Sequence, residues 1–189
     1  MLKNQTKFAL NFKILRVMFI FPLLITIPFF LENNNVKAGL EFQWDQDSGY
    51  RRLKWFQTDG EKRSRNSIFF FFRPSDRKAE LIKLNLKIPK TFNSTLKEEK
   101  ISFCKVIIGG FDTRTRCLEN IPADIELNED NSSLNIFPYT PIPANKDSYA
   151  IVFKVFNPKR TGLYQFHSYG QLVGNTSSNY IGSWTIVID

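Results

Sequence analysis

The chain has 189 residues, of which 26 are Lys or Arg, 18 are Asp or Glu and one is His. Its 42% hydrophobic and 23% charged residues are typical of a globular protein, and its length fits one domain. Nineteen Phe and six Tyr beside nine Gly and nine Pro favour an aromatic-rich β core. This composition excludes a collagen, a coiled coil and a largely disordered chain.

Residues 1–38 are interpreted as a signal peptide. Four basic residues precede the uncharged, fifteen-residue apolar run 17–31, and short residues before Gly39 predict cleavage after Ala38. The alternative is an uncleaved membrane anchor, but fifteen residues are fewer than the roughly 20 that span a bilayer. Cleavage removes five basic residues and one acidic residue, so 21 basic and 17 acidic residues remain, a net charge of +4.

Residues 39–73 form an arm that is basic and rich in aromatic residues. Its cations suit an anionic envelope polymer or a membrane surface, and its rings could stack on a polysaccharide. A solvated charged surface without a ligand is the alternative. Nucleic acid is not an expected partner, because an exported protein seldom meets it. The candidate binding residues of the arm are Trp44, Arg51, Arg52, Lys54 and Trp55.

The run from Phe69 to Phe72 at the end of the arm predicts a strand. Four exposed Phe in a row would promote aggregation. We therefore expect this strand to be buried on both faces of its sheet.

Residues 74–189 are interpreted as one all-β domain. Every second residue from Ile82 to Ile88 is apolar and the residues between are polar, as in a half-buried strand. Residues 91–100 could form one helical turn or a long loop. The pattern predicts a single antiparallel β-sandwich, immunoglobulin-like in general architecture, behind the cleaved signal peptide. Further short runs rich in β-branched and aromatic residues lie at 101–108, 133–137, 149–156, 163–169 and 184–188.

Cys104 and Cys117 are the two cysteines of a chain that is predicted to be exported. The midpoint of their spacing falls at Gly110-Phe111, the expected tip of a hairpin. The residue numbers of two paired residues in an antiparallel hairpin always add up to the same sum. With the turn at this midpoint, the two thiols should therefore face each other. An oxidising compartment would then give a disulfide, stabilising by about 3 kcal/mol, and two buried free thiols are the alternative.

Two motifs near the C-terminus carry a family resemblance. They are Asn157-Pro158-Lys159-Arg160-Thr161-Gly162-Leu163-Tyr164-Gln165-Phe166 and Tyr180-Ile181-Gly182-Ser183-Trp184. The chain resembles, over residues 69–189, a family of short exported cyanobacterial proteins that carry a domain of unknown function. The resemblance implies an exported β-sandwich and brings no activity, substrate or catalytic residue with it. The cysteines and the basic arm are peculiar to this sequence.

His167, the single histidine, lies in a predicted strand, with Ser168 pointing to the opposite face. No G-x-S-x-G elbow accompanies it, so a structural role is favoured over catalysis. A cupredoxin copper site needs two His and a Cys, usually with a Met, and both Met lie within the signal peptide. Structural zinc lacks ligands for the same reason. No metal or other cofactor is expected.

Four pairs of neighbouring carboxylates are candidates for an acid-base or calcium site. A glycosidase needs two carboxyls about 5–10 Å apart across a cleft, which neighbours in polar loops do not indicate. A calcium site would lack the EF-hand spacing, so solvated turns are the favoured interpretation. The pairs are Asp45 and Asp47, Glu98 and Glu99, Asp124 and Glu126, and Glu129 and Asp130.

The sequence therefore predicts an exported, non-enzymatic β-sandwich of the cell envelope with a binding or scaffolding role. Its compartment would be the periplasm, the thylakoid lumen or the extracellular medium. The alternative is an envelope hydrolase whose carboxylate site forms only in the fold. A deep cleft that holds two of the named acids would favour the enzyme, whereas an aromatic and basic face would favour binding.

Overall fold

The computed structural model describes residues 49–189. The chain divides into two units, Met1–Phe42 and Gln43–Asp189, and every described residue belongs to the second. The predicted signal peptide, its cleavage site and Trp44 lie outside the described residues. Residues 49–189 include no helix long and apolar enough to cross a membrane.

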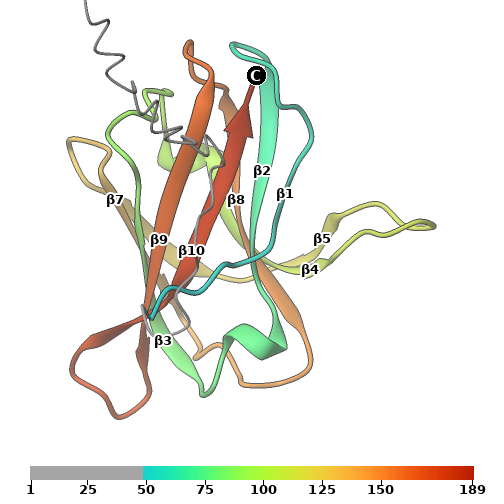
Figure 1. Cartoon of the computed structure of the whole chain (residues 1–189). Coiled ribbons are helices and arrows are strands. Elements are labelled where there is room, and N and C mark those ends of the chain that lie inside the picture. The colour runs from blue at the N-terminus through green and yellow to red at the C-terminus, as the bar shows by residue number, and fades with distance from the viewer. Residues whose placement is uncertain (1–48) are drawn as a thin grey trace, which may run out of the picture. The chain divides into compact units, whose positions relative to one another are not determined.

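The described strands form two antiparallel five-stranded sheets (Figure 1), which confirms the predicted all-β sandwich. The β8 sheet has the order β1 (Trp55–Gln57), β2 (Arg65–Phe72), β8 (Ser148–Phe156), β4 (Ile101–Ile107) and β5 (Arg116–Asn120). The β9 sheet has the order β10 (Ser178–Ile188), β9 (Gly162–Leu172), β3 (Leu81–Lys87), β7 (Ser133–Pro138) and β6 (Ala123–Leu127). Two short 3-10 helices, η2 (Pro74–Asp76) and η3 (Glu98–Lys100), lie in the connections.

The main core lies between the two sheets and is built around aromatic rings. Trp184 of β10 is fully buried, and its ring lies 5.1 Å from the rings of Phe70 and Phe72 of β2. The ring of Phe166 from β9 lies 4.8 Å from that of Phe70. Burying one such side chain contributes about 1.5–3 kcal/mol, so these rings join the two sheets firmly.

The alternation predicted for β3 is confirmed except at its start. Leu84 and Leu86 are buried, as expected for the core face. A register irregularity between Leu81 and Lys83 places Leu81 in the core in place of Ile82, which is only half-buried. A bulge of this kind inserts one residue and so exchanges the faces on which its neighbours lie.

The described part of the arm predicted at residues 39–73 does not stand apart from the sandwich. Leu53 is buried, and its N–H donates to the Ser183 carbonyl at 2.8 Å, so this segment lies along β10. The chain then crosses to the other sheet, where the Phe71 N–H donates to the Lys54 carbonyl at 3.1 Å. The boundary predicted at residue 74 is therefore corrected: β1 and β2 are strands of the β8 sheet, because their backbone groups find partners only there.

One further segment differs from the prediction, and one that the sequence left open is decided. Residues 123–127, interpreted from Asp124 and Glu126 as a solvated turn, form β6, with Ile125 and Leu127 packed against the core. Acidic residues that point outward are compatible with a half-buried strand. Because this strand is short, its alternation of apolar and acidic residues resembled a polar turn. Residues 91–100 form a long loop that ends in η3.

Candidate functional site

The outward face of the β8 sheet carries a second apolar cluster. We name it the outer cluster and define it as Phe69, Phe71, Cys104, Val106, Ala150 and Val152. Phe69 and Phe71 alternate with Phe70 and Phe72 of the main core, and all four rings are buried. This confirms that the Phe run is buried on both faces. An apolar outward face is unusual for an antiparallel sheet, which normally turns polar residues to solvent.

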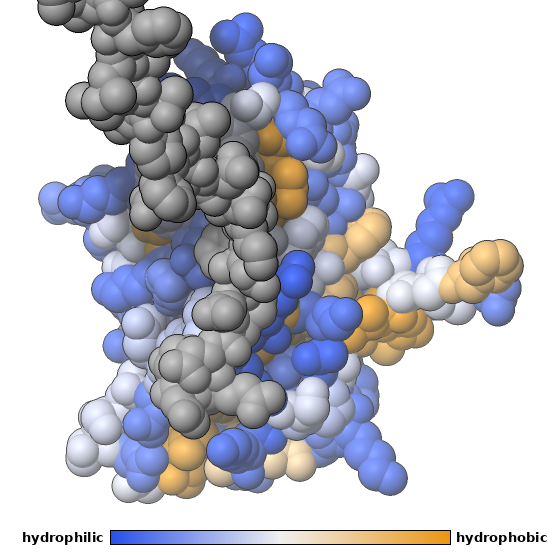
Figure 2. Space-filling view, in the orientation of Figure 1, coloured by the Kyte–Doolittle hydropathy of each residue, from blue (hydrophilic) through white to orange (hydrophobic). Residues whose placement is uncertain are grey.

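The hairpin formed by β4 and β5 lies beside this cluster. Ile108 and Thr115 of the hairpin line a groove of about 310 Å³ together with Lys54, Phe56 and Phe71. We name this the β1 groove. In Figure 2 hydrophobic residues gather at the root and at the tip of the hairpin. The hairpin therefore forms one wall of a groove whose other wall is β1.

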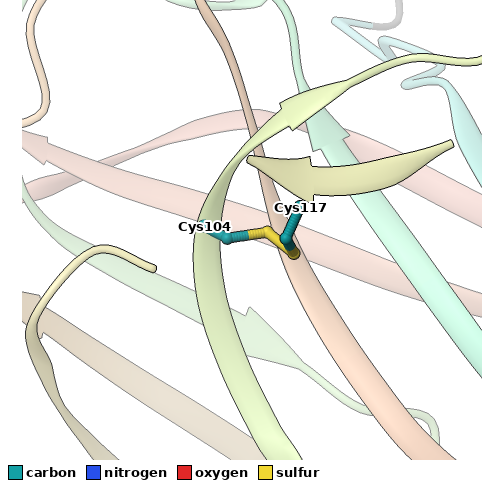
Figure 3. Close-up of a disulfide and its surroundings, with 2 residues drawn as sticks. All are labelled: Cys104 and Cys117. Atoms are coloured by element: carbon teal, nitrogen blue, oxygen red, sulfur yellow. A yellow bond between two sulfur atoms is a disulfide. The ribbon is translucent and has the colours of Figure 1, made fainter. Parts of the chain in front are cut away.

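The predicted disulfide between Cys104 and Cys117 is confirmed, with the two Cα atoms 5.7 Å apart (Figure 3). The predicted register is wrong. Cys117 pairs with Val106, while Cys104 pairs with Asn120, so the disulfide joins diagonal neighbours. The reason is an irregularity between Lys105 and Val106 and a turn one residue later than expected. Diagonal neighbours share a face of the sheet, which keeps the disulfide feasible.

Of the predicted binding residues, Arg51 is committed to a structural role. Its guanidinium lies 3.3 Å from the buried carboxylate of Asp76 and donates to the Ser75 carbonyl. Arg73 binds the same carboxylate at 3.0 Å. A buried charge needs such partners, so Arg51 fastens the segment before β1 to η2.

Arg52 and Lys54 are the predicted cations that stay exposed. Within residues 49–189 neither forms an ion pair, and both line a groove of about 340 Å³ with Leu53 and Trp55. Trp55 is half-buried and packs partly against the main core, and its predicted role in stacking on a ligand stays a prediction. Phe56, another aromatic residue of the arm, is 38% exposed at this edge.

A second basic groove lies at the other end of the same face. It has a volume of about 430 Å³, and Arg65, Lys100 and Lys154 line it together with Phe156. The Arg65 guanidinium lies 5.5 Å from the centre of the Phe156 ring, which is 57% exposed. We name this the β2 groove. Its cations come from β2, η3 and β8, so their proximity could not be read from spacing in the sequence.

Positive charge is thus concentrated on this face. Among the described residues, the outward positions of the five strands of the β8 sheet hold no Asp or Glu, and Glu119 of β5 pairs with Lys105 in the row that faces the other way. A surface of one sign with apolar walls attracts ligands of the opposite sign.

His167 lies in a hydrogen-bonded group on the other sheet. Its Nδ1 atom is 2.7 Å from the Ser183 hydroxyl, and the Tyr180 hydroxyl is 2.6 Å from the same oxygen. Ser183 is fully buried, so its hydroxyl is not available to a substrate in this arrangement. Ser168 is buried on the opposite face, as predicted.

Four acids of the described carboxylate pairs, Glu98, Glu99, Asp124 and Asp130, make side-chain contacts. Glu98 accepts the Leu127 N–H, and Glu99 lies 3.8 Å from Lys97. Asp124 accepts the Tyr139 hydroxyl at 2.9 Å and thereby raises the pKa of that phenol. Hydrogen bonds from Ser132 hold the pKa of Asp130 below its usual value. The β1 and β2 grooves are not lined by any of these acids, and residues 49–189 hold no cluster of three metal-ligating side chains.

The first C-terminal motif fixes the loop that precedes β2. The Asn157 amide donates to the carbonyls of Asp59 and Glu61 and accepts from the buried Asn66 amide at 2.9 Å. The Tyr164 hydroxyl donates to the Arg160 carbonyl at 2.6 Å, in the manner of the tyrosine corner of immunoglobulin-like sandwiches.

The second motif allows the segment before β1 to pack closely against β10. A Cβ atom at Gly182 would lie 2.7 Å from the Arg51 carbonyl oxygen, so only glycine allows that approach. Both motifs are therefore explained by the fold.

Three solved structures show a similar arrangement of strands. The bacterial hydrophobin BslA is 10% identical, with a TM-score of 0.48 over 73% of this chain and 97% of that chain. The collagen-binding domain of a Staphylococcus aureus adhesin is 11% identical, with a TM-score of 0.40 over 71% and 95%. The collagen-binding subdomain ACE19 of an Enterococcus faecalis surface protein is 12% identical, with a TM-score of 0.41 over 70% and 95%. No curated protein is significantly similar in sequence.

The sequence profile of one family matches residues 43–188. The match contains both C-terminal motifs and begins well before Phe69, where the resemblance noted in the sequence begins. It also contains β1, β2 and the segment that lies along β10, in agreement with the corrected boundary of the sandwich. The chain belongs to this family, which is described as Protein of unknown function (DUF2808).

Proposed function

We propose that the protein is an exported, non-enzymatic binding protein of the cell envelope, and that its ligand is an anionic polysaccharide held on the outward face of the β8 sheet. The observation that carries the proposal is the pair of basic grooves at the two ends of this face. The β2 groove holds Arg65, Lys100 and Lys154, and the β1 groove holds Lys54; none of these four cations forms an ion pair among residues 49–189, whereas Arg73 of the β1 groove is paired with Asp76. Each groove also has an exposed aromatic ring, Phe56 in the β1 groove and Phe156 in the β2 groove.

The spacing of the grooves favours a polymer over a small ligand. Arg65 and Arg73 mark the two ends of β2, eight residues apart, which corresponds to about 26 Å at the usual rise of a strand. A linear polymer can occupy both grooves at once. Once one groove is filled, binding in the second is intramolecular, so the overall affinity rises. A short anion can occupy only one.

Export is supported by the predicted signal peptide and by the disulfide, since disulfides persist in oxidising compartments. The hydrolase alternative finds little support, because none of the described acids proposed for its site lines either of the two grooves. The predicted arm contributes Lys54 to the β1 groove, Arg52 lines the neighbouring groove of about 340 Å³, and Trp44 stays a prediction.

The experiment is chromatography of the exported protein on immobilised polygalacturonate, with a salt gradient. We expect wild-type protein to be retained and to elute as salt screens its exposed charges, since the screening length is about 10 Å at 0.1 M. The double variant Lys54→Gln and Lys154→Gln should elute at lower salt. Oligogalacturonates too short to span the two grooves should compete weakly at equal charge concentration.

The matched control is the double variant Lys83→Gln and Lys87→Gln, which removes the same charge from the outward face of the β9 sheet. It should elute with the wild type. Equal loss of retention in both double variants would contradict a defined binding face. Failure to bind polygalacturonate, together with binding to phosphatidylglycerol vesicles that the Lys54→Gln and Lys154→Gln variant weakens, would replace the polysaccharide with a lipid surface on this face.

A further inference from the structure

The β4–β5 hairpin projects from the sandwich (Figure 1). Pairing between β4 and β8 ends where Val106 lies opposite Ser148, so the rest of the hairpin has no neighbouring strand. Its end is closed by a hydrogen bond from the Gly110 N–H to the Thr113 carbonyl at 3.0 Å. A loop of two residues between them therefore stands in solvent.

Phe111 is one of these two loop residues. Its relative exposure of 106% is the highest of any large apolar side chain in residues 49–189. Ile108, which directly follows β4, and Leu118 of β5 are 37% and 51% exposed. A soluble protein gains nothing from a fully exposed Phe at the end of a projection, and clustered exposed apolar groups mark an interaction site.

The charges at the tip are mixed but positive in sum. Asp112 shares the loop with Phe111, while Arg114 and Arg116 follow on the returning strand and are exposed. Lys105, nearer the root, is already paired with Asp147 at 2.8 Å. The tip thus presents one aromatic ring with two cations behind it.

The hairpin is also held rigid. The disulfide joins β4 and β5 at the root, and the Gly109 N–H donates to the Thr115 hydroxyl at 2.9 Å. A Cβ atom at Gly109 would lie 2.6 Å from the Thr115 nitrogen, so the strands approach more closely than another residue would allow. A rigid hairpin loses little conformational entropy when its tip binds a ligand.

We propose that this hairpin is a membrane-interface anchor: Phe111 inserts among the headgroups of an anionic bilayer, and Arg114 and Arg116 bind lipid phosphates. An apolar tip backed by basic residues is the pattern by which peripheral proteins dock on anionic lipid. Asp112 limits the depth to the headgroup layer, because a carboxylate in hydrocarbon is strongly unfavourable. A protein partner would normally bury about 800 Å² on each side, which one narrow hairpin does not offer.

The proposal rests on the tip of the hairpin, whereas the β1 groove is lined by residues nearer its root, Ile108, Gly109 and Thr115. Its test measures binding of the exported protein to phosphatidylcholine vesicles with and without phosphatidylglycerol, by flotation. Phe111→Ser should lower the partition coefficient at least about tenfold on both kinds of vesicle. Arg114→Gln or Arg116→Gln should lower it about fivefold on the anionic vesicles and leave the neutral ones unchanged.

Two further variants make the result specific. Tyr139→Ser removes another exposed aromatic ring, 68% exposed and located after β7, and should bind vesicles as the wild type does. Phe111→Trp should bind normally, and its fluorescence should be quenched by lipids brominated near the headgroup.

The proposal would be overturned if Phe111→Ser bound vesicles like the wild type, or if brominated lipids left the fluorescence of Phe111→Trp unchanged. It would also be overturned if Phe111→Ser abolished self-association in sedimentation velocity while vesicle binding was absent in all variants, because the tip would then bind a second copy. Retention of Phe111→Ser on polygalacturonate should equal that of the wild type, which separates this inference from the proposed function.

Discussion

The two sheets differ in what they turn outward. The β9 sheet presents polar residues of both charges, such as Lys83, Asn85 and Glu126, with Asn85 donating to Asn135 at 2.8 Å. The β8 sheet presents the outer cluster, flanked by cations and covered on one side by the hairpin. One outward face is thus ordinary solvated sheet, and the other is a second small core with basic grooves at its ends. The difference indicates where binding is to be sought.

The largest expected effect is a difference in stability between substitutions on the outward faces of the two sheets. Phe71→Ala should lower the free energy of unfolding by about 4 kcal/mol, as in a main core, because its ring is buried in the outer cluster. Lys87→Ala, outward on the β9 sheet, should change it by less than about 0.5 kcal/mol. Urea unfolding measures both. A small effect for Phe71→Ala would show that the outer cluster is not a core.

The second prediction concerns the disulfide that lies in the outer cluster. Replacing Cys104 and Cys117 by Ala should lower the free energy of unfolding by about 3 kcal/mol, because the closed loop restricts the unfolded chain. Wild-type protein unfolded with and without reductant should show the same difference, whereas the variant should be indifferent to reductant. No effect of reductant on the wild type would contradict the cross-link.

A smaller effect separates the two arginines that precede β1. Arg51→Ala should destabilise by about 1.5 kcal/mol, since the buried Asp76 carboxylate loses one of its two charged partners and keeps Arg73. Arg52→Ala, whose side chain is exposed, should change stability by less than about 0.5 kcal/mol. Thermal unfolding of the two variants side by side checks this. Equal losses of stability in the two variants would mean that the ion pair of Arg51 does not stabilise the fold.

The smallest effect is a pH dependence at the root of the hairpin. A hydrogen bond from Lys105 holds the pKa of Asp147 below its usual value, and the same bond raises the pKa of Lys105. The contribution of Asp147 is therefore present above the pKa of an unfolded Asp and is lost as pH falls through the lowered value. That of Lys105 is present below the pKa of an unfolded Lys and is lost as pH rises through the raised value.

Lys105→Met should accordingly flatten the stability profile at both its acidic and its alkaline ends, while Lys83→Met on the other sheet should leave the profile unchanged. Stability measured by urea unfolding across the pH range provides the comparison. An unaltered profile for Lys105→Met would mean that the pair is too well solvated to matter.

The sequence by itself determined the features that depend on neighbours along the chain. Strict alternation placed Leu84 and Leu86 on the core face, because successive side chains of a strand point to opposite sides. The run at Phe69 predicted two-sided burial, because exposure of such a run is unfavourable. Two cysteines on one hairpin predicted the disulfide, since both the expected register and the observed diagonal register place their side chains on the same face of the sheet.

Tertiary structure decided what depends on distant segments meeting. The turn position set the diagonal register of Cys104, and the buried Asp76 turned Arg51 from a candidate ligand contact into an ion pair. The β2 groove joins three elements whose cations are separated in the chain by many residues, so no local pattern could reveal it. The reason is physical: alternation fixes which face a side chain occupies, whereas the packing of the sheets and the hairpin fixes what lies opposite that face.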